Sequence, residues 1–155
     1  MFNGVLLFQL ARLFTTTSNM KLIKQLKRHE GYRRLVYECS RGVLTVGIGR
    51  NLESVGISEK EAEFLLQNDI DSAIERLNKH DLLDGHDEVR QAVLINMAFN
   101  LGVNGLLKFK KSINHWKNHE YEEFSKEILN SRWARQVGGR AKELSEQART
   151  GKWQF

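Results

Sequence analysis

The chain has 155 residues, of which 41% are hydrophobic and 28% charged, a balance typical of a folded globular protein and not of a disordered or fibrous one. Its formal net charge of +5 favours an anionic partner but does not tell a nucleic acid from a membrane surface or another acidic polymer. Cys39 is the single cysteine, which excludes an internal disulfide, and no apolar run reaches the roughly 18 to 20 residues of a membrane-spanning helix.

The first 19 residues are largely apolar. They differ from a secretory signal because no Lys or Arg precedes the apolar run, Arg12 interrupts it, and no small-residue cleavage site follows. The leucines fall on one stripe of a helix, which is typical of a weak membrane-surface segment or a small docking helix. The other interpretation is that Met20 begins the folded domain and residues 1–19 are an extension.

A short helix followed by a hairpin is predicted next. Polar residues 15–19 are expected to form a linker and to cap a helix that ends at Glu30 and Gly31. Two β-prone runs follow at residues 35–37 and 43–46, and the turn residues 40–42 lie between them. This pattern predicts an antiparallel hairpin.

The remainder of the chain has helical spacing. Ser58 and Glu61 fit a capping box, and apolar residues then recur from Ala62 to Leu77, which predicts a long helix. A second apolar face runs from Val89 to Leu101. Shorter helices are predicted at residues 106–116, 121–130, 131–135 and 140–149. We therefore expect a predominantly helical α+β protein, in which a small hairpin lobe is joined by a long helix to an all-α lobe.

Three residues around the predicted hairpin form a candidate catalytic group. If the hairpin folds back beside the helix end, Glu30, Cys39 and Thr45 surround one cleft, where partial desolvation would raise the pKa of Glu30 and keep it protonated as a general acid. Glycoside cleavage pairs such an acid with a second group, most often a carboxylate. A thiolate can serve if positive charge lowers its pKa, and arginines 33, 34 and 41 are near. Taken singly, each residue has an ordinary structural explanation.

The motifs around these residues resemble the phage T4-type lysozymes, whose active site contains Glu, Asp or Cys, and Thr. The first block comprises HEG at residues 29–31, Tyr37, Cys39, Gly42 and TVGIG at residues 45–49. The second comprises NMAFNLG at residues 96–102 and FKKS at residues 109–112. The third comprises SRW at residues 131–133, Gln136, RAK at residues 140–142 and RTGKW at residues 149–153. The resemblance extends from Met20 to about Trp153, with the family's intervals between the three active-site residues.

The resemblance implies the two-lobed lysozyme-like α+β fold and hydrolysis of the β-1,4 bond between N-acetylmuramic acid and N-acetylglucosamine. It divides the chain into an extension at residues 1–19 and a lysozyme domain at residues 20–155. Within that domain, residues 20–57 and the start of the connecting helix form the N-terminal lobe, and residues from about 80 to 155 form the helical lobe.

The resemblance also assigns roles to individual residues. Glu30 would donate the proton, Cys39 would be the second catalytic group, and Thr45 would help to hold the attacking water. Phe99 and Ser112 would bind substrate, and Arg140 would support the site by pairing with Glu30. Arg50 stands where the family often has histidine, and we expect it to pair with Asp69 on the long helix.

The implied partner is bacterial peptidoglycan, and we expect a monomer without cofactor or metal. The five histidines lack the arrangement of a metal site and are interpreted as solvated surface residues. The protein is expected to be stored in the host cytoplasm before lysis and to reach the wall through a separate pore protein. One alternative is a catalytically silent peptidoglycan-binding module. The other is a nucleic-acid-binding protein, favoured by charge alone, since no nucleic-acid motif is visible.

Overall fold

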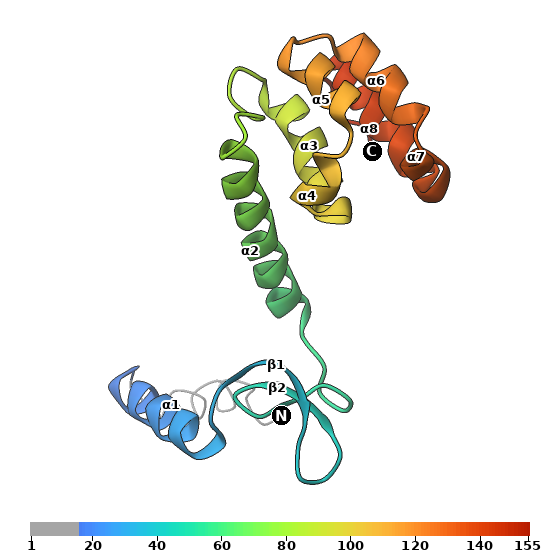
Figure 1. Ribbon diagram of the computed structural model, residues 1–155. Coiled ribbons are helices and arrows are strands. Elements are labelled where there is room, and N and C mark those ends of the chain that lie inside the picture. The colour runs from blue at the N-terminus through green and yellow to red at the C-terminus, as the bar shows by residue number, and fades with distance from the viewer. Residues whose placement is uncertain (1–15) are drawn as a thin grey trace, which may run out of the picture. The chain divides into compact units, whose positions relative to one another are not determined.

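The structure is a computed structural model that describes residues 16–155 (Figure 1). The chain divides into two compact units, residues 1–61 and residues 62–155. Within the described residues there are eight helices and one antiparallel sheet of three strands, which confirms the predicted α+β class. None of these helices is both long enough and apolar enough to cross a membrane. The predictions for residues 1–15 lie outside the described residues.

The first unit contains helix α1 and the sheet. The helix is α1 (Thr16–Glu30), and the strands are β1 (Arg33–Glu38), β2 (Leu44–Gly47) and β3 (Arg50–Asn51). The hairpin of β1 and β2 is confirmed, whereas the two-residue β3 was not predicted. The linker predicted at residues 15–19 is wrong over residues 16–19, which belong to α1. Thr, Ser and Asn cost at most about 0.7 kcal/mol each relative to alanine in a helix, so an established helix extends through them.

A five-residue loop, residues 39–43, connects β1 to β2. The backbone N–H of Gly42 donates to the carbonyl oxygen of Cys39 at 2.8 Å, and the N–H of Cys39 donates to the carbonyl oxygen of Val43 at 3.0 Å. Gly42 has φ +74°, which glycine adopts without the steric cost that a Cβ imposes. The loop therefore fixes Cys39 at its base, beside the first residues of the returning chain.

Helix α2 (Glu59–Asn78) begins at the predicted capping box. The carboxylate of Glu61 accepts a hydrogen bond from the N–H of Ser58 at 2.8 Å, and the hydroxyl oxygen of Ser58 accepts one from the N–H of Glu61 at 3.3 Å. Arg50, which was predicted to pair with Asp69, pairs within its own unit with Glu61 at 2.9 Å. Arg50 also donates to the carbonyl oxygen of Gly56 at 2.8 Å. These bonds join the end of the sheet to the first turn of α2.

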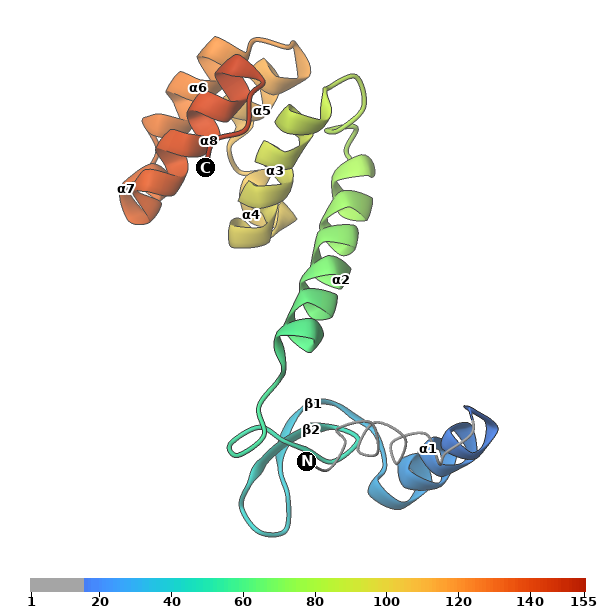
Figure 2. The ribbon, with the colours of Figure 1, turned by 180° about the vertical axis from the view of Figure 1, so that it is seen from behind.

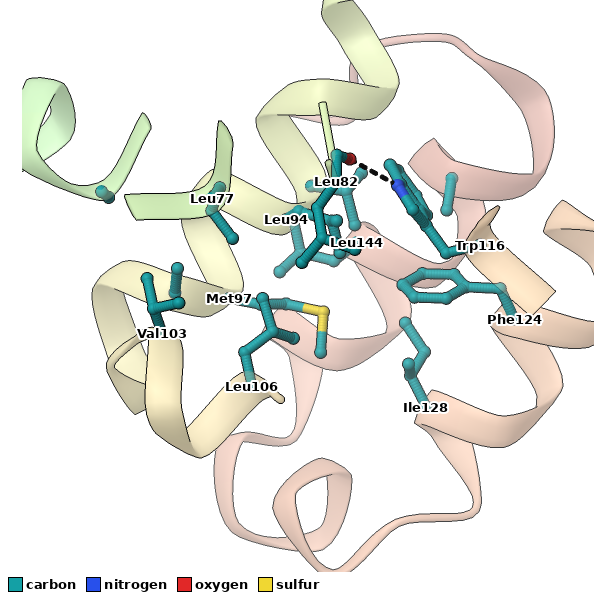
Figure 3. Packing of buried hydrophobic residues seen from close by; sticks show 14 of the residues in the cluster. Leu77, Leu82, Leu94, Met97, Val103, Leu106, Trp116, Phe124, Ile128 and Leu144 are labelled. Carbon is teal, nitrogen blue, oxygen red and sulfur yellow. Dashed lines mark hydrogen bonds between the residues drawn. The ribbon is translucent and has the colours of Figure 1, made fainter. Parts of the chain in front are cut away.

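The second unit consists of helices packed around one hydrophobic core (Figures 1 and 2). Besides the rest of α2, they are α3 (Glu88–Leu101), α4 (Val103–Leu106), α5 (Lys110–Lys117), α6 (Tyr121–Leu129), α7 (Arg132–Val137) and α8 (Gly139–Thr150). Figure 3 shows Met97, Leu106, Trp116, Phe124 and Ile128 in this core, where all five side chains are fully buried. The indole N–H of Trp116 donates to the carbonyl oxygen of Leu82 at 2.8 Å. The predicted apolar face of α3 is confirmed, and the helix predicted at residues 106–116 is divided by a turn before α5.

Arg90 connects three parts of the helical unit. Its guanidinium donates to the carbonyl oxygens of Ala148 at 2.8 Å and Arg149 at 3.2 Å, and it pairs with Asp87 at 2.7 Å. A cation at the C-terminal carbonyls of α8 is favoured by the helix dipole. The guanidinium also lies 4.0 Å from the ring centroid of Tyr121 at the start of α6. Arg90 therefore holds α3, α6 and α8 together.

Replacing Arg90 with Ala is expected to lower the free energy of unfolding of the helical unit by about 2 to 3 kcal/mol, because the carbonyl oxygens lose a charged donor and Tyr121 loses its cation. Urea unfolding followed by circular dichroism measures this loss. The exposed Arg135 in α7 is the control, and its replacement with Ala should change stability by less than about 0.5 kcal/mol. Equal effects of the two substitutions would contradict the role given to Arg90.

Candidate active site

The structure brings the side chains of Cys39 and Thr45 together in the first unit. Thr45 is buried on β2, and Cys39 is half-buried after the end of β1. The backbone N–H groups of Arg41 and Val43 lower the pKa of the Cys39 thiol by hydrogen bonding, and the Thr45 and Arg41 side chains add to this effect, whereas desolvation opposes it. The pKa was predicted to fall because of positive charge. In the structure, hydrogen bonds from the loop are the main cause.

The hydroxyl of Thr45 has two acceptors within reach. It donates to the carbonyl oxygen of Val43 at 2.9 Å, and it is near enough to the Cys39 thiol to help to lower its pKa. A hydroxyl has one proton and two acceptor lone pairs, so Thr45 can donate to the thiolate or keep its proton on Val43 and accept from another group.

Glu30 is the last residue of α1, and the helix ends there because Gly31 adopts φ +72°. The side chain of Glu30 is exposed, so the predicted partial desolvation does not come from the described residues of its own unit, 16–61. Its carboxylate lies against Gly49, where an added Cβ would be 3.2 Å from Oε2. Glu30 thus contacts the turn that follows β2. Within residues 16–155, no hydrogen bond or ion pair joins it to Cys39 or Thr45, and the catalytic roles of all three stay predictions.

Replacing Gly49 with Ala is expected to lower wall-lytic activity at least about tenfold, since it pushes on the Glu30 carboxylate and misplaced catalytic groups are costly. Gly49 has φ +75°, so the same change should cost about 1 to 2 kcal/mol of stability. Initial rates on purified wall and urea unfolding measure the two effects. Gly138 is a matched control away from the candidate residues, because it has φ +58° and nothing within 4 Å of an added Cβ. Equal losses of activity in both variants would show that backbone strain, and not contact with Glu30, is responsible.

Phe99 and Arg140 line one pocket of the helical unit. Phe99 on α3 is 50% exposed, and the pocket has a volume of about 430 Å³. The pocket is lined by Leu66, Ile70, Ala92, Ile95, Asn96, Phe99 and Arg140. Arg140 donates to the side-chain oxygen of Asn96 from Nε at 2.8 Å and from Nη2 at 2.6 Å. Its partner in this unit is therefore Asn96, and its predicted pairing with Glu30, a residue of the other unit, stays a prediction.

Ser112 is buried in the first turn of α5 and lines a different pocket from Phe99. This second pocket, of about 290 Å³, is lined by Lys108, Phe109, Lys110, Lys111, Ser112, Glu127, Asn130 and Ser131. Sequence reasoning identified Ser112 but missed the lysines. The signal that could have found them is the clustering of three lysines around Phe109 in the sequence. Because α5 starts at Lys110, this one short segment supplies all three lysines to the pocket.

The histidines differ from expectation in one case. His86 is buried, with 8% of its surface exposed, so its interpretation as a solvated residue is wrong. Its ring packs on Trp116 with centroids 4.5 Å apart. Among residues 16–155, no three His, Cys, Asp or Glu side chains are grouped as a metal ion requires.

Comparison with known proteins places these features in a family. The phage lysozyme family model matches residues 27–150. The chain is 28% identical over 156 residues to the probable T4-type lysozyme 1 of Dictyostelium discoideum, covering 81% of this chain and 92% of that protein. It is 26% identical to the probable T4-type lysozyme 2 of the same organism, with the same coverage. It is also 27% identical to the pre-baseplate central spike protein Gp5 of Enterobacteria phage T4, covering 86% of this chain but 28% of that protein.

Proposed function

The chain belongs to the phage lysozyme family, and from this premise we propose that it is an endolysin that hydrolyses the β-1,4 bond between N-acetylmuramic acid and N-acetylglucosamine. Peptidoglycan hydrolysis is the activity that the family supports. The choice of this glycosidic bond and the role in host lysis go beyond the family and are our proposal.

The observation that carries the proposal is the environment of Cys39. Glycosidases pair a general acid with a second group that attacks the sugar or activates water. Hydrogen bonds from the loop and from Thr45 lower the pKa of the Cys39 thiol, and the thiol is half-buried beside that hydroxyl. Hydrogen bonds that stabilise a thiolate are typical of reactive cysteines and not of cysteines that only fill space.

In the proposed reaction, Glu30 donates its proton to the glycosidic oxygen as the bond to the sugar carbon breaks. The thiolate of Cys39 accepts a proton from a water molecule that Thr45 helps to orient, and the water oxygen forms the new bond to that carbon. Water is consumed, and the two residues regain their starting protonation once the proton passes from the thiol back to the glutamate. This arrangement gives inversion at the sugar carbon.

The helical unit would supply contacts to the rest of the substrate. Phe99 offers an exposed ring for packing against a sugar face, and Ser112 offers a hydroxyl in a pocket ringed by lysines. The wall polymer carries carboxylates, and the net charge of +5 favours its approach.

Digestion of purified peptidoglycan, followed by mass and anomer analysis of the fragments, tests the proposal. We expect fragments that have gained one water, carry N-acetylmuramic acid at the reducing end and first appear as the inverted anomer. Intact wall with protein bound to it would instead identify a silent binding module. Cleavage at the other glycosidic bond or in the peptide would overturn the proposed specificity.

A further inference from the structure

A cluster of aromatic and imidazole rings lies at one corner of the helical unit, away from the candidate catalytic residues. His86 belongs to the loop before α3, Trp116 to α5, His119 to the loop between α5 and α6, and Tyr121 to the start of α6. The His86 ring lies 4.5 Å from Trp116, 4.6 Å from His119 and 5.8 Å from Tyr121 between centroids. The cluster therefore joins segments that are about 35 residues apart in the chain.

Both histidines bond to the same hydroxyl. Nδ1 of His86 lies 2.8 Å from the hydroxyl oxygen of Tyr121, and Nδ1 of His119 lies 2.9 Å from it. The hydroxyl has one proton, so it donates to one Nδ1 and accepts an N–H from the other. Both bonds exist only if at least one ring is neutral with a free lone pair on Nδ1. Once both rings are protonated, each Nδ1 is a donor, and the tyrosine O–H is left without an acceptor in the cluster.

The neighbouring positive charges also favour the neutral form of His86. Protonation of His86 places a cation beside His119 and beside Arg90, which already lies 4.0 Å from the Tyr121 ring centroid. The opposing acids are Asp84 on the loop and Asp87 at the N-cap of α3, and Asp87 is engaged with Arg90 at 2.7 Å. Desolvation, followed by His119, lowers the pKa of His86. The folded unit therefore favours the neutral ring.

The backbone around His119 shows that the contact is held under some strain. His119 has φ +59°, a left-handed conformation that is uncommon for residues other than glycine. Its ring packs over Gly85, where an added Cβ would be 3.6 Å from Cε1. The side-chain bonds of the cluster thus stabilise a turn that its own backbone disfavours.

We propose that His86, His119 and Tyr121 form a proton-operated latch, which holds the start of α6 against the loop before α3 at neutral pH and loosens this corner on acidification. The direction of this pH dependence follows from the linkage between proton binding and folding. Because the folded state depresses the pKa of His86, the latch contributes fully above the ordinary histidine value of 6.5. Its contribution is lost as the pH falls from there towards the lowered value. The opening is local, so the core around Met97 and α8 stays folded.

Hydrogen exchange of the full chain, corrected for intrinsic rates, tests the latch at about pH 8 and about pH 5, on either side of the ordinary histidine pKa. Amide protection over residues 82–87 and 115–121 should fall on acidification by about tenfold for each pKa unit of depression, while that of α8 stays constant. Tyr121→Phe should lower protection of these segments at the higher pH and have little effect at the lower pH. Equal effects at both values would overturn the proposal.

Two further variants keep the test decisive if Tyr121→Phe folds poorly. His86→Phe retains a ring against Trp116 but cannot titrate, so the acid-dependent opening should disappear. His80→Gln removes an exposed histidine and should leave the opening unchanged. Nuclear magnetic resonance titration of the wild type should give His86 a midpoint below the ordinary histidine value of 6.5. Acid opening that survives in His86→Phe, or a His86 midpoint at or above 6.5, would contradict the latch.

Discussion

Glu30→Gln is expected to lower wall-lytic activity by more than about a hundredfold, because the amide keeps the size of the side chain but has no proton to give to the leaving oxygen. The fold should be unaffected, since Glu30 is exposed and its carboxylate makes no hydrogen bond to the described residues of its own unit, 16–61. The decrease in turbidity of permeabilised cells and fragment release from purified wall both measure the loss.

Glu38→Gln is the matched control for this experiment. Glu38 is an exposed glutamate at the end of β1, so the variant carries the same change in charge and should remain active. If Glu30→Gln retained wild-type activity, Glu30 would not be the general acid. If both variants lost activity equally, net charge and wall binding would explain the result instead.

Three substitutions at Cys39 are expected to have ordered effects. Cys39→Asp should keep substantial activity because a carboxylate can replace the thiolate as the base. Cys39→Ala and Cys39→Ser should each lose at least about a hundredfold, since alanine has no proton acceptor and the serine hydroxyl stays neutral near pH 7. A thiol-blocking reagent should inhibit the wild type and spare the aspartate variant. Initial rates on purified wall give the order.

A packing role for Cys39 predicts the opposite order. If the thiol only filled space, alanine and serine would remain active and aspartate would be the harmful change, because it would partly bury a charge. The pH profile adds a second criterion. Since the pKa of Cys39 is lowered, wild-type activity should rise as the thiolate forms below the ordinary thiol pKa. In Cys39→Asp this acid limb should move to lower pH, because carboxylates ionise earlier.

Local patterns predicted the elements that depend on neighbouring residues. The hairpin and the start of α2 follow from β-prone runs, a glycine-containing turn and a capping box, and each of these signals acts within a few residues. The first turn of α1 was missed because the polar residues 16–19 fit both a linker and a helix. A strand of two residues, such as β3, is too short to produce an alternating pattern.

The details of the site depend on contacts that a linear pattern does not show. The sequence indicated that Cys39 and Thr45 could be close, but not that the N–H groups of the loop would be the main cause of the lowered pKa. The burial of His86 could not be predicted, because its partners Trp116 and Tyr121 lie 30 and 35 residues further along the chain. Histidine is intermediate in its tendency to be buried, so the residue type alone did not indicate that His86 would be buried.

The half-exposed thiol in the candidate active site also makes the protein sensitive to oxidants. Peroxide reacts with thiolates in proportion to their ionisation and accessibility, first giving a sulfenic acid that thiols can reduce and then sulfinic and sulfonic acids that ordinary thiols cannot. An aspartate in the same place is inert to this chemistry. Cys39 has a lowered pKa and no second cysteine in the chain with which to form a protective disulfide. Reducing conditions would therefore preserve the proton acceptor that we propose at Cys39, and oxidative stress would destroy it.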